Sequence, residues 1–452
     1  MRIKQISVSG LFGIFDHVIP LNMDERITVI HGPNGFGKTA MLRILSAFFN
    51  SRYSDLRTIP FSKFCVEFDN GSNVEIIKSS NSSEEIENNF VINFHDSDLH
   101  IVDFQPKRRP DIENLPLGIL DDYIPGLKRI SSRKWLYTPT QENLSLEEVL
   151  ERFGDSLGIF KSEAEPEWFE KLKKNIYIRL IESQRLLNLF PNRPFKSDDR
   201  TPSILSTVSA YSYELAKLMQ DKFKEYGTIS QSLDRSFPMR VVKHQSSPDL
   251  TDEPLRNQLE KLGNRLNELE ETRSRLIEVG LLDQDEDSEF QIQPQDIDES
   301  TKNALSVYVE DVGKKLNVFT EIATKINLLK RIINNKFSYK EINFSKDNGF
   351  TFTTLYDSSL SDSKTLSPTD LSSGEQHELV LLYELLFKVE PNSLVLIDEP
   401  ELSLHVGWQV QFLKDLQEIT KLADLDILIA THSPDIIQDR WDLTVELKGP
   451  VK

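Results

Sequence analysis

The feature that most constrains this fold is a glycine-rich run placed between a strand and a helix. Residues 32–39 read Gly-Pro-Asn-Gly-Phe-Gly-Lys-Thr, after an apolar strand predicted over 26–31 and before a helix predicted over 38–49. Glycines in such a turn let backbone N–H groups curl around an anion, and the helix start adds its positive end. The run therefore predicts a phosphate loop in an α/β fold.

The same run supplies groups for a nucleotide and its metal. Lys38 is expected to reach the β- and γ-phosphates of ATP, and the Thr39 hydroxyl to bind Mg²⁺. The residues expected around the phosphates are Gly32, Pro33, Asn34, Gly35, Phe36, Gly37, Lys38, Thr39 and Ala40.

A second apolar strand, predicted over 394–397, ends in two carboxylates, Asp398 and Glu399. Together with a phosphate loop, this pattern predicts that Asp398 holds Mg²⁺ through water. Glu399 is then placed to act as the general base that polarises the attacking water. Fully apolar strands that alternate with helices indicate a parallel sheet covered on both faces.

The segment 371–376, Leu-Ser-Ser-Gly-Glu-Gln, precedes a helix predicted over 377–388. It resembles the signature motif of ABC ATPases, in the form found in the SMC, RecF and overcoming-lysogenization-defect groups. In that superfamily the signature of one subunit caps the γ-phosphate held by another, which implies that Ser372 and Gly374 act in trans. A hydroxyl, a glycine and a helix N-terminus also suit an anion physically.

Further segments carry the same resemblance. His432 follows a strand predicted over 425–430 and resembles the switch histidine that senses the γ-phosphate; 400–405 resembles the loop that crosses between subunits. Gln184, at the end of a strand predicted over 175–182, is our choice for the glutamine that completes the Mg²⁺ shell, with Gln141 as competitor. Phe12 and Phe15 are candidates for stacking the adenine.

These motifs predict an α/β fold, an ABC-type P-loop ATPase head with an antiparallel β subdomain and an inserted antiparallel helical hairpin. Residues 1–200 form the N-terminal lobe with the phosphate loop and β-hairpins. Residues 201–339 form the helical insertion, where leucine-rich heptads over 255–276 and 305–333 suggest a short coiled-coil-like hairpin. Residues 340–452 form the C-terminal lobe with the signature, the two carboxylates and the histidine.

Composition limits the partners and the compartment. The formal net charge of −19 argues against general affinity for nucleic acid, although basic residues between 107 and 200 form a candidate patch. The alternative for that patch is an ordinary solvated surface. The single cysteine, Cys65, and the lack of a long apolar run indicate a cytoplasmic protein without a membrane partner.

The resemblance implies a homodimer, or a higher homo-oligomer, that sandwiches ATP and Mg²⁺ between its subunits. Only 20 residues follow His432, fewer than the nuclease domain of overcoming-lysogenization-defect proteins needs. The chain is therefore similar to the compact ATPases of anti-phage systems such as Septu or PARIS, which implies a separate HNH nuclease as effector. The alternatives are a RecF-like DNA clamp in repair and, less favoured, a transporter ATPase.

Overall fold

The computed structural model divides the chain into two compact units. One unit joins Met1–Thr207 with Ser372–Lys452, and the other is the middle part, Val208–Leu371. The strand pair at 340–354 belongs to the middle unit, whereas the sequence analysis grouped it with the C-terminal lobe. The described residues are 1–78, 90–96, 101–106, 124, 127–131, 133–137, 142–146, 148–149, 165–182, 206–245, 255–283, 299–354 and 365–450.

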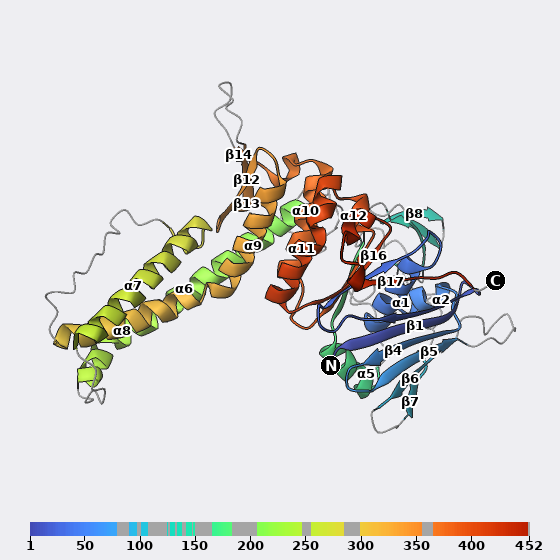
Figure 1. Ribbon diagram of the computed structural model, residues 1–452, viewed down its shortest axis with the longest axis horizontal. Helices are drawn as coiled ribbons and strands as arrows, with labels where there is room; N and C mark the ends of the chain where they lie inside the picture. The colour runs from blue at the N-terminus through green and yellow to red at the C-terminus, as the bar shows by residue number, and fades with distance from the viewer. Residues whose placement is uncertain are drawn as a thin grey trace. The chain divides into compact units, whose positions relative to one another are not determined.

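A five-stranded parallel sheet in the first unit takes its strands from both ends of the chain (Figure 1). The order is β11 (Ile178–Ile181), β15 (Leu394–Asp398), β16 (Asp426–Thr431), β3 (Ile27–His31) and β17 (Thr444–Glu446). All four neighbouring pairs are parallel. Because parallel strands end at one edge, the segments that follow β3, β15 and β16 lie close together.

A second sheet in this unit is antiparallel throughout. Its order is β2 (Phe15–Pro20), β1 (Ile3–Leu11), β4 (Lys63–Phe68), β5 (Asn73–Lys78), β6 (Phe90–His95) and β7 (Ile101–Phe104). Strand β2 alternates buried and exposed residues, as a strand with one covered face does. The predicted α/β head with an antiparallel β subdomain is confirmed.

Helix α1 (Lys38–Phe49) contributes to the hydrophobic core that the two sheets share. Its buried residues include Met41, Leu45 and Phe48, and the same core contains Ile6 of β1 and Leu396 of β15. A helix that is apolar on most of its circumference is stable only when covered on several sides. The helix that follows the phosphate loop is therefore held firmly by packing.

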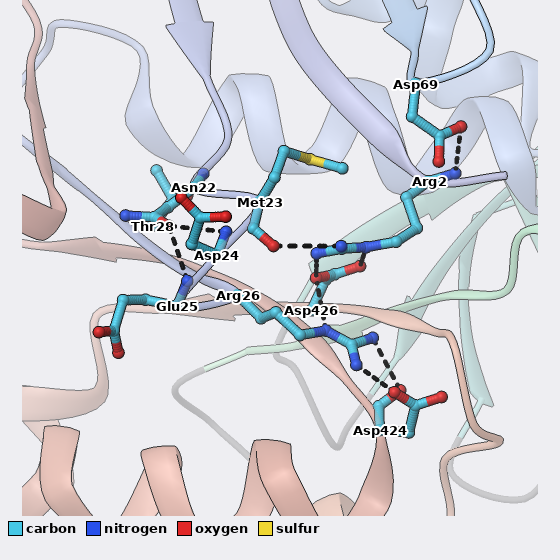
Figure 2. A network of polar contacts seen from close by, with 10 residues as sticks. All are labelled: Arg2, Asn22, Met23, Asp24, Glu25, Arg26, Thr28, Asp69, Asp424 and Asp426. Atoms are coloured by element: carbon cyan, nitrogen blue, oxygen red, sulfur yellow. Dashed lines mark hydrogen bonds and ion pairs between the residues drawn. The ribbon is translucent and has the colours of Figure 1, made fainter.

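An ion network fastens the antiparallel sheet to the amino end of the parallel sheet (Figure 2). Asp426, the first residue of β16, accepts hydrogen bonds from Arg2 Nε at 2.8 Å and from Arg26 Nε at 3.1 Å. Arg26 also pairs with Asp424, and the backbone N–H of Arg2 bonds to Asp69 Oδ1 at 3.0 Å. The first residues of the chain are thereby joined to its last quarter.

The remaining elements of the first unit surround these sheets. Strands β8 (Leu127–Ser131), β9 (Lys134–Tyr137) and β10 (Glu142–Ser145) form a small antiparallel sheet. The other elements are α2 (Tyr53–Thr58), α5 (Glu167–Asn175), α10 (Ser373–Phe387), η3 (Pro400–Leu402), α11 (Val406–Ala423), α12 (Pro434–Ile437) and η4 (Trp441–Leu443). Within the described part of the chain, no helix is both long and apolar enough to cross a membrane.

The middle unit consists of long helices and a small sheet. The helices are α6 (Thr207–Gln245), α7 (Leu255–Glu278), α8 (Glu299–Asn317) and α9 (Thr320–Lys336). Strands β12 (Lys340–Ser345), β13 (Gly349–Thr354) and β14 (Thr365–Leu366) form the sheet, and η2 (Pro368–Asp370) follows it. Figure 1 shows α6, α7 and α8 side by side.

Contacts between these helices give their directions. Lys302 Nζ bonds to Gln258 Oε1 at 2.7 Å, and Gly313 lies beside Leu269, so α7 and α8 advance together and are parallel. Helix α6 runs the opposite way. Its Asp234 pairs with Lys315 at 2.7 Å, and its Arg240 pairs with Asp311.

The antiparallel character predicted for the insertion is therefore present, but the predicted partners are wrong. The stretches 255–276 and 305–333 were expected to form the two antiparallel arms, whereas α7 and α8 are parallel and α6 is antiparallel to α8. A heptad pattern reveals an apolar face but not the direction of the partner. The 20 residues between α7 and α8 are also long enough to span the helix length and let the chain return.

Candidate functional site

The phosphate loop forms the turn between β3 and α1, and its backbone needs glycine. Gly35 and Gly37 have φ angles of 83° and 87°, in the left-handed region. A Cβ at Gly37 would lie 2.3 Å from Leu11 Cδ2 of β1. A side chain at position 37 would therefore strain the backbone and displace the tip of Leu11.

Lys38 folds over this loop. Its side chain is buried, and Nζ donates to the carbonyl oxygens of Gly32 at 2.8 Å and Pro33 at 3.2 Å. Burial lowers the pKa of Lys38, although the charges of Glu399, Glu401 and Asp398 act in the opposite direction. A buried ammonium held by neutral carbonyls is well placed to receive an anion.

Thr39 and Asp398 bring two oxygen donors together. Thr39 Oγ1 donates to Asp398 Oδ1 at 3.0 Å. Burial raises the pKa of Asp398 to about 6, against the effect of the Thr39 hydrogen bond. A buried carboxylate of this kind gains strongly from a cation, and a hydroxyl with a carboxylate suits Mg²⁺.

The donor set also fits a metal shared with a phosphate. Among the described residues, no three or more His, Cys, Asp or Glu side chains are grouped to hold a metal. Mg²⁺ commonly takes only one or two protein ligands, with water and phosphate oxygens completing its shell. Thr39 and Asp398 fit that mode of binding.

Glu399 and His432 complete the cluster at this edge of the sheet. Glu399 has left-handed angles, φ 44° and ψ 57°, and its N–H bonds to the Ala430 carbonyl at 2.8 Å. His432 Nε2 lies 3.4 Å from Glu399 Oε1, and its Nδ1 lies 3.2 Å from Lys38 Nζ. A strained, non-glycine backbone in a polar cluster is typical of functional sites.

The family model described as AAA ATPase domain, AAA_15, matches residues 1–437. The chain belongs to this family. The segments that meet in the cluster, from Gly32 to His432, all lie within the matched part of this AAA ATPase domain.

Solved structures similar to this ATPase domain are head domains of SMC proteins. An SMC head with an extended coiled coil from Pyrococcus furiosus, bound to the C-terminal domain of ScpA, is 12% identical, with a TM-score of 0.36; the match covers 100% of this chain and 94% of that one. The SMC head domain from Thermotoga maritima is 11% identical, with a TM-score of 0.34, and the match covers 100% of both chains. The family assignment rests on the family model alone. No curated protein matches the chain.

The predicted signature segment leads into α10, and its two serines are exposed. Ser372 is the N-cap, and its backbone N–H and hydroxyl both bond to Glu375 Oε2 at 2.8 Å in a capping box. The nearest atom to a Cβ built on Gly374 is Ser403 O at 3.7 Å, an ordinary contact. Packing within the chain therefore does not require glycine at position 374.

Sequence reasoning missed the contribution of Glu401. Its carboxylate accepts hydrogen bonds from Thr431 Oγ1 at 2.9 Å and from the N–H of His432 at 2.6 Å. The available signal was a further carboxylate two residues after Glu399, but nothing local to 399–401 indicates a contact with residues 30 positions later.

The two aromatic candidates for the adenine differ in exposure. Phe15 is buried, and its ring packs 5.1 Å from that of Phe36. Phe12 is 45% exposed and lies beside Gly37 of the phosphate loop. Gln184 and its competitor Gln141 lie outside the described residues.

The segment after the matched part also touches the phosphate loop. The N–H of Leu447 bonds to the His31 carbonyl at 2.9 Å. A Cβ on Gly32 would lie 3.1 Å from Leu447 O, and one on Gly449 would lie 3.4 Å from the Phe36 ring. The loop is thus supported on this side by residues that follow β17.

The basic residues of this patch that the structure describes fall into two groups, exposed and ion-paired. Lys128, Arg129, Arg133 and Lys134 are exposed on the small sheet β8–β10. Lys173, in contrast, pairs with Glu165 and bonds to Ser51 Oγ at 2.8 Å. Residues 107–109 lie outside the described residues.

Proposed function

We propose that the protein binds and hydrolyses ATP and uses this reaction to switch between two states of assembly. The phosphate loop with Lys38 holds the phosphates, and Glu399 acts as general base. Thr39 and Asp398 would hold Mg²⁺, which neutralises phosphate charge when bound. Gln184 remains our choice for the additional metal ligand.

One observation carries this proposal. Lys38, Thr39, Asp398, Glu399 and His432 come from three segments and form one connected cluster at the edge of the parallel sheet. A cation, a metal-binding pair, a base and a histidine are the groups that phosphoryl transfer needs. Exposed Phe12 is the better of the two candidates for contact with the adenine.

The switch acts through a second copy of the chain. At the start of α10, Ser372 is exposed and Gly374 is partly exposed, and no packing within the chain accounts for the glycine. They cap the γ-phosphate held by another subunit, so that ATP becomes part of the interface. Hydrolysis removes this bridge and favours separation.

The output of the switch is control of a separate HNH-type nuclease in cytoplasmic anti-phage defence. The support for this finer assignment is indirect: the signature and the segment 400–405 have the form of SMC- and RecF-like ATPases and not of transporters, and the chain as a whole resembles the compact ATPases of such systems.

The first test compares the wild type with Glu399→Gln by light scattering, with and without Mg-ATP, alongside purification from the native operon. Removal of the base leaves ATP bound but not hydrolysed, so this variant becomes an ATP-dependent dimer or larger, and the nuclease co-purifies. A variant that stays monomeric with ATP bound contradicts the shared site. A dimer that purifies alone contradicts only the effector.

A RecF-like DNA clamp is the second candidate, because the exposed basic residues of β8 and β9 offer a surface for phosphates. This function requires DNA binding by the purified protein that ATP strengthens and salt weakens. Replacement of Lys128 and Lys134 by glutamate would then abolish binding. Retention of ATPase activity in this variant separates the two candidates.

A further inference from the structure

Two side chains join the segment 400–405 to the turn that carries His432. The first is Glu401. One of its carboxylate oxygens accepts the Thr431 hydroxyl at 2.9 Å, and the other accepts the backbone N–H of His432 at 2.6 Å. A charged acceptor makes both hydrogen bonds stronger than neutral ones.

The second side chain is Gln409, which is buried at the start of α11. Its Nε2 donates to the carbonyl oxygens of Glu401 and Leu404 at 3.4 and 3.3 Å, and its Oε1 accepts the Ser433 hydroxyl at 2.7 Å. The N–H of Ser433 in turn bonds to Thr431 Oγ1 at 3.0 Å. Each of the residues 431–433 therefore has a hydrogen bond to Glu401, to Gln409 or to a neighbour in the turn.

This arrangement fixes the backbone from which the His432 ring projects. The ring lies between Lys38 Nζ at 3.2 Å and Glu399 Oε1 at 3.4 Å. A small rotation of the turn would move both distances out of contact range. The position of the ring thus depends on a carboxylate that belongs to the neighbouring segment.

We propose that Glu401 is a positioning residue of the ATPase site that acts through His432. This inference rests on the proposed function.

The test is a double-mutant cycle in ATP hydrolysis. Glu401→Ala lowers kcat on the order of tenfold or more while KM for ATP changes little, because the phosphate loop is intact. Glu401→Gln recovers part of the loss, since its amide oxygen still accepts the His432 N–H. Asp435→Ala, which removes an exposed carboxylate of α12, is the matched control and leaves kcat unchanged.

The double variant, Glu401→Ala with His432→Ala, decides whether Glu401 acts through His432. If Glu401 acts through His432, then Glu401→Ala slows the His432→Ala protein by less than about twofold. If the factors by which the two substitutions lower kcat multiply in the double variant, the proposal is overturned. A Glu401→Ala protein with normal kcat also overturns it. Thermal melting identifies a variant that has lost its fold, in which case Glu401→Gln takes its place in the cycle.

A second readout needs no turnover. In protein labelled at histidine ¹³Cε1, the resonance of His432 is identified by its loss in His432→Ala. Glu401→Ala shifts this resonance and Asp435→Ala does not; an unchanged resonance overturns the proposal. A wild type that fails to bind ATP contradicts the proposed function instead, and the resonance still reports on the contact.

Discussion

The two halves of the proposed nucleotide site differ in how they are held. The phosphate-loop half lies on a buried helix, and its polar groups contact residues from distant parts of the chain, such as Asp398 and His432. In the signature half the two serines are exposed, and Ser372 contacts Glu375 of its own helix. One half is assembled by the fold, whereas the other is a local structure that presents groups outward.

Because of this difference, the glycine in each half is constrained for a different reason. Gly37 is required by the fold, because its φ of 87° lies in the left-handed region, where a side chain strains the backbone. Gly374 has room for a Cβ, so a requirement for glycine at this position would have to come from a molecule outside the chain. Substitutions in the first half should act within one subunit, and those in the second half should act between subunits.

The largest effect is expected at Lys38. Lys38→Ala removes the ammonium from the phosphate site and lowers ATP affinity by roughly 100-fold, about 2–3 kcal/mol. Equilibrium binding of a fluorescent ATP analogue measures this change, with replacement of the exposed Lys4 of β1 (Lys4→Ala) as the control. Unchanged affinity would mean that ATP does not bind at the loop.

Gly374→Ala tests the other half. The alanine fits within the chain and favours the helix, so thermal stability stays level or rises. ATP hydrolysis falls on the order of tenfold, while ATP binding to the monomer is retained. Activity restored on mixing this variant with Lys38→Ala, whose signature is intact, would establish the shared site. A mixture as inactive as its components argues against it.

A smaller, pH-dependent effect is expected at Asp398. Because the pKa of Asp398 is raised to about 6, its carboxylate is mostly ionised at pH 7.5 and mostly protonated at pH 5. Only the ionised form attracts Mg²⁺, so Mg²⁺-dependent ATP affinity falls as the pH drops through about 6. Titration calorimetry at several pH values, with ATP alone as the reference, measures this trend.

The same shift has a consequence for the metal-free protein. A raised carboxylate pKa means that the folded state binds the proton more tightly than the unfolded state, so stability is lost as pH rises from about 4 to about 6. Asp398→Asn removes this loss and melts at a higher temperature than the wild type at pH 7.5. An equal or lower melting temperature there would contradict the assignment.

The smallest effect on activity is expected far from the site. Arg2→Ala removes one of the two arginines on Asp426 and costs about 1 kcal/mol of folding stability, because the pair is partly exposed and Arg26 remains. Urea unfolding measures the loss. The kcat for ATP should stay within about twofold of the wild type, and a larger drop would show that the network influences the site.

Local patterns in the sequence were sufficient to predict much of the fold of the first unit. The apolar runs before Gly32, Asp398 and His432 predicted three strands of the parallel sheet, because strands covered on both faces are apolar throughout. The β-hairpins predicted within residues 1–200 include the one that β4 and β5 form. These features depend on residues close together in the chain.

What the sequence did not reveal depends on contacts between distant residues. The direction of α7 relative to α8 follows from pairs such as Gln258 with Lys302, which periodicity does not specify. Helix α6 contains Pro238 and received no prediction of its own within 201–339. The contact of Glu401 with Thr431 likewise arises only when β15 and β16 pair.

The position of β3 has a consequence for synthesis of the protein. Ile27 pairs with Ile427, and the other neighbour of β3 is β17, at residues 444–446. At about 5–20 residues per second, the strand that leads into the phosphate loop waits roughly 20–80 s for its partners to leave the ribosome. The antiparallel sheet and α1 can collapse meanwhile, but the catalytic edge cannot exist. A chain cut short in translation would therefore carry a phosphate loop without the residues proposed to hydrolyse ATP.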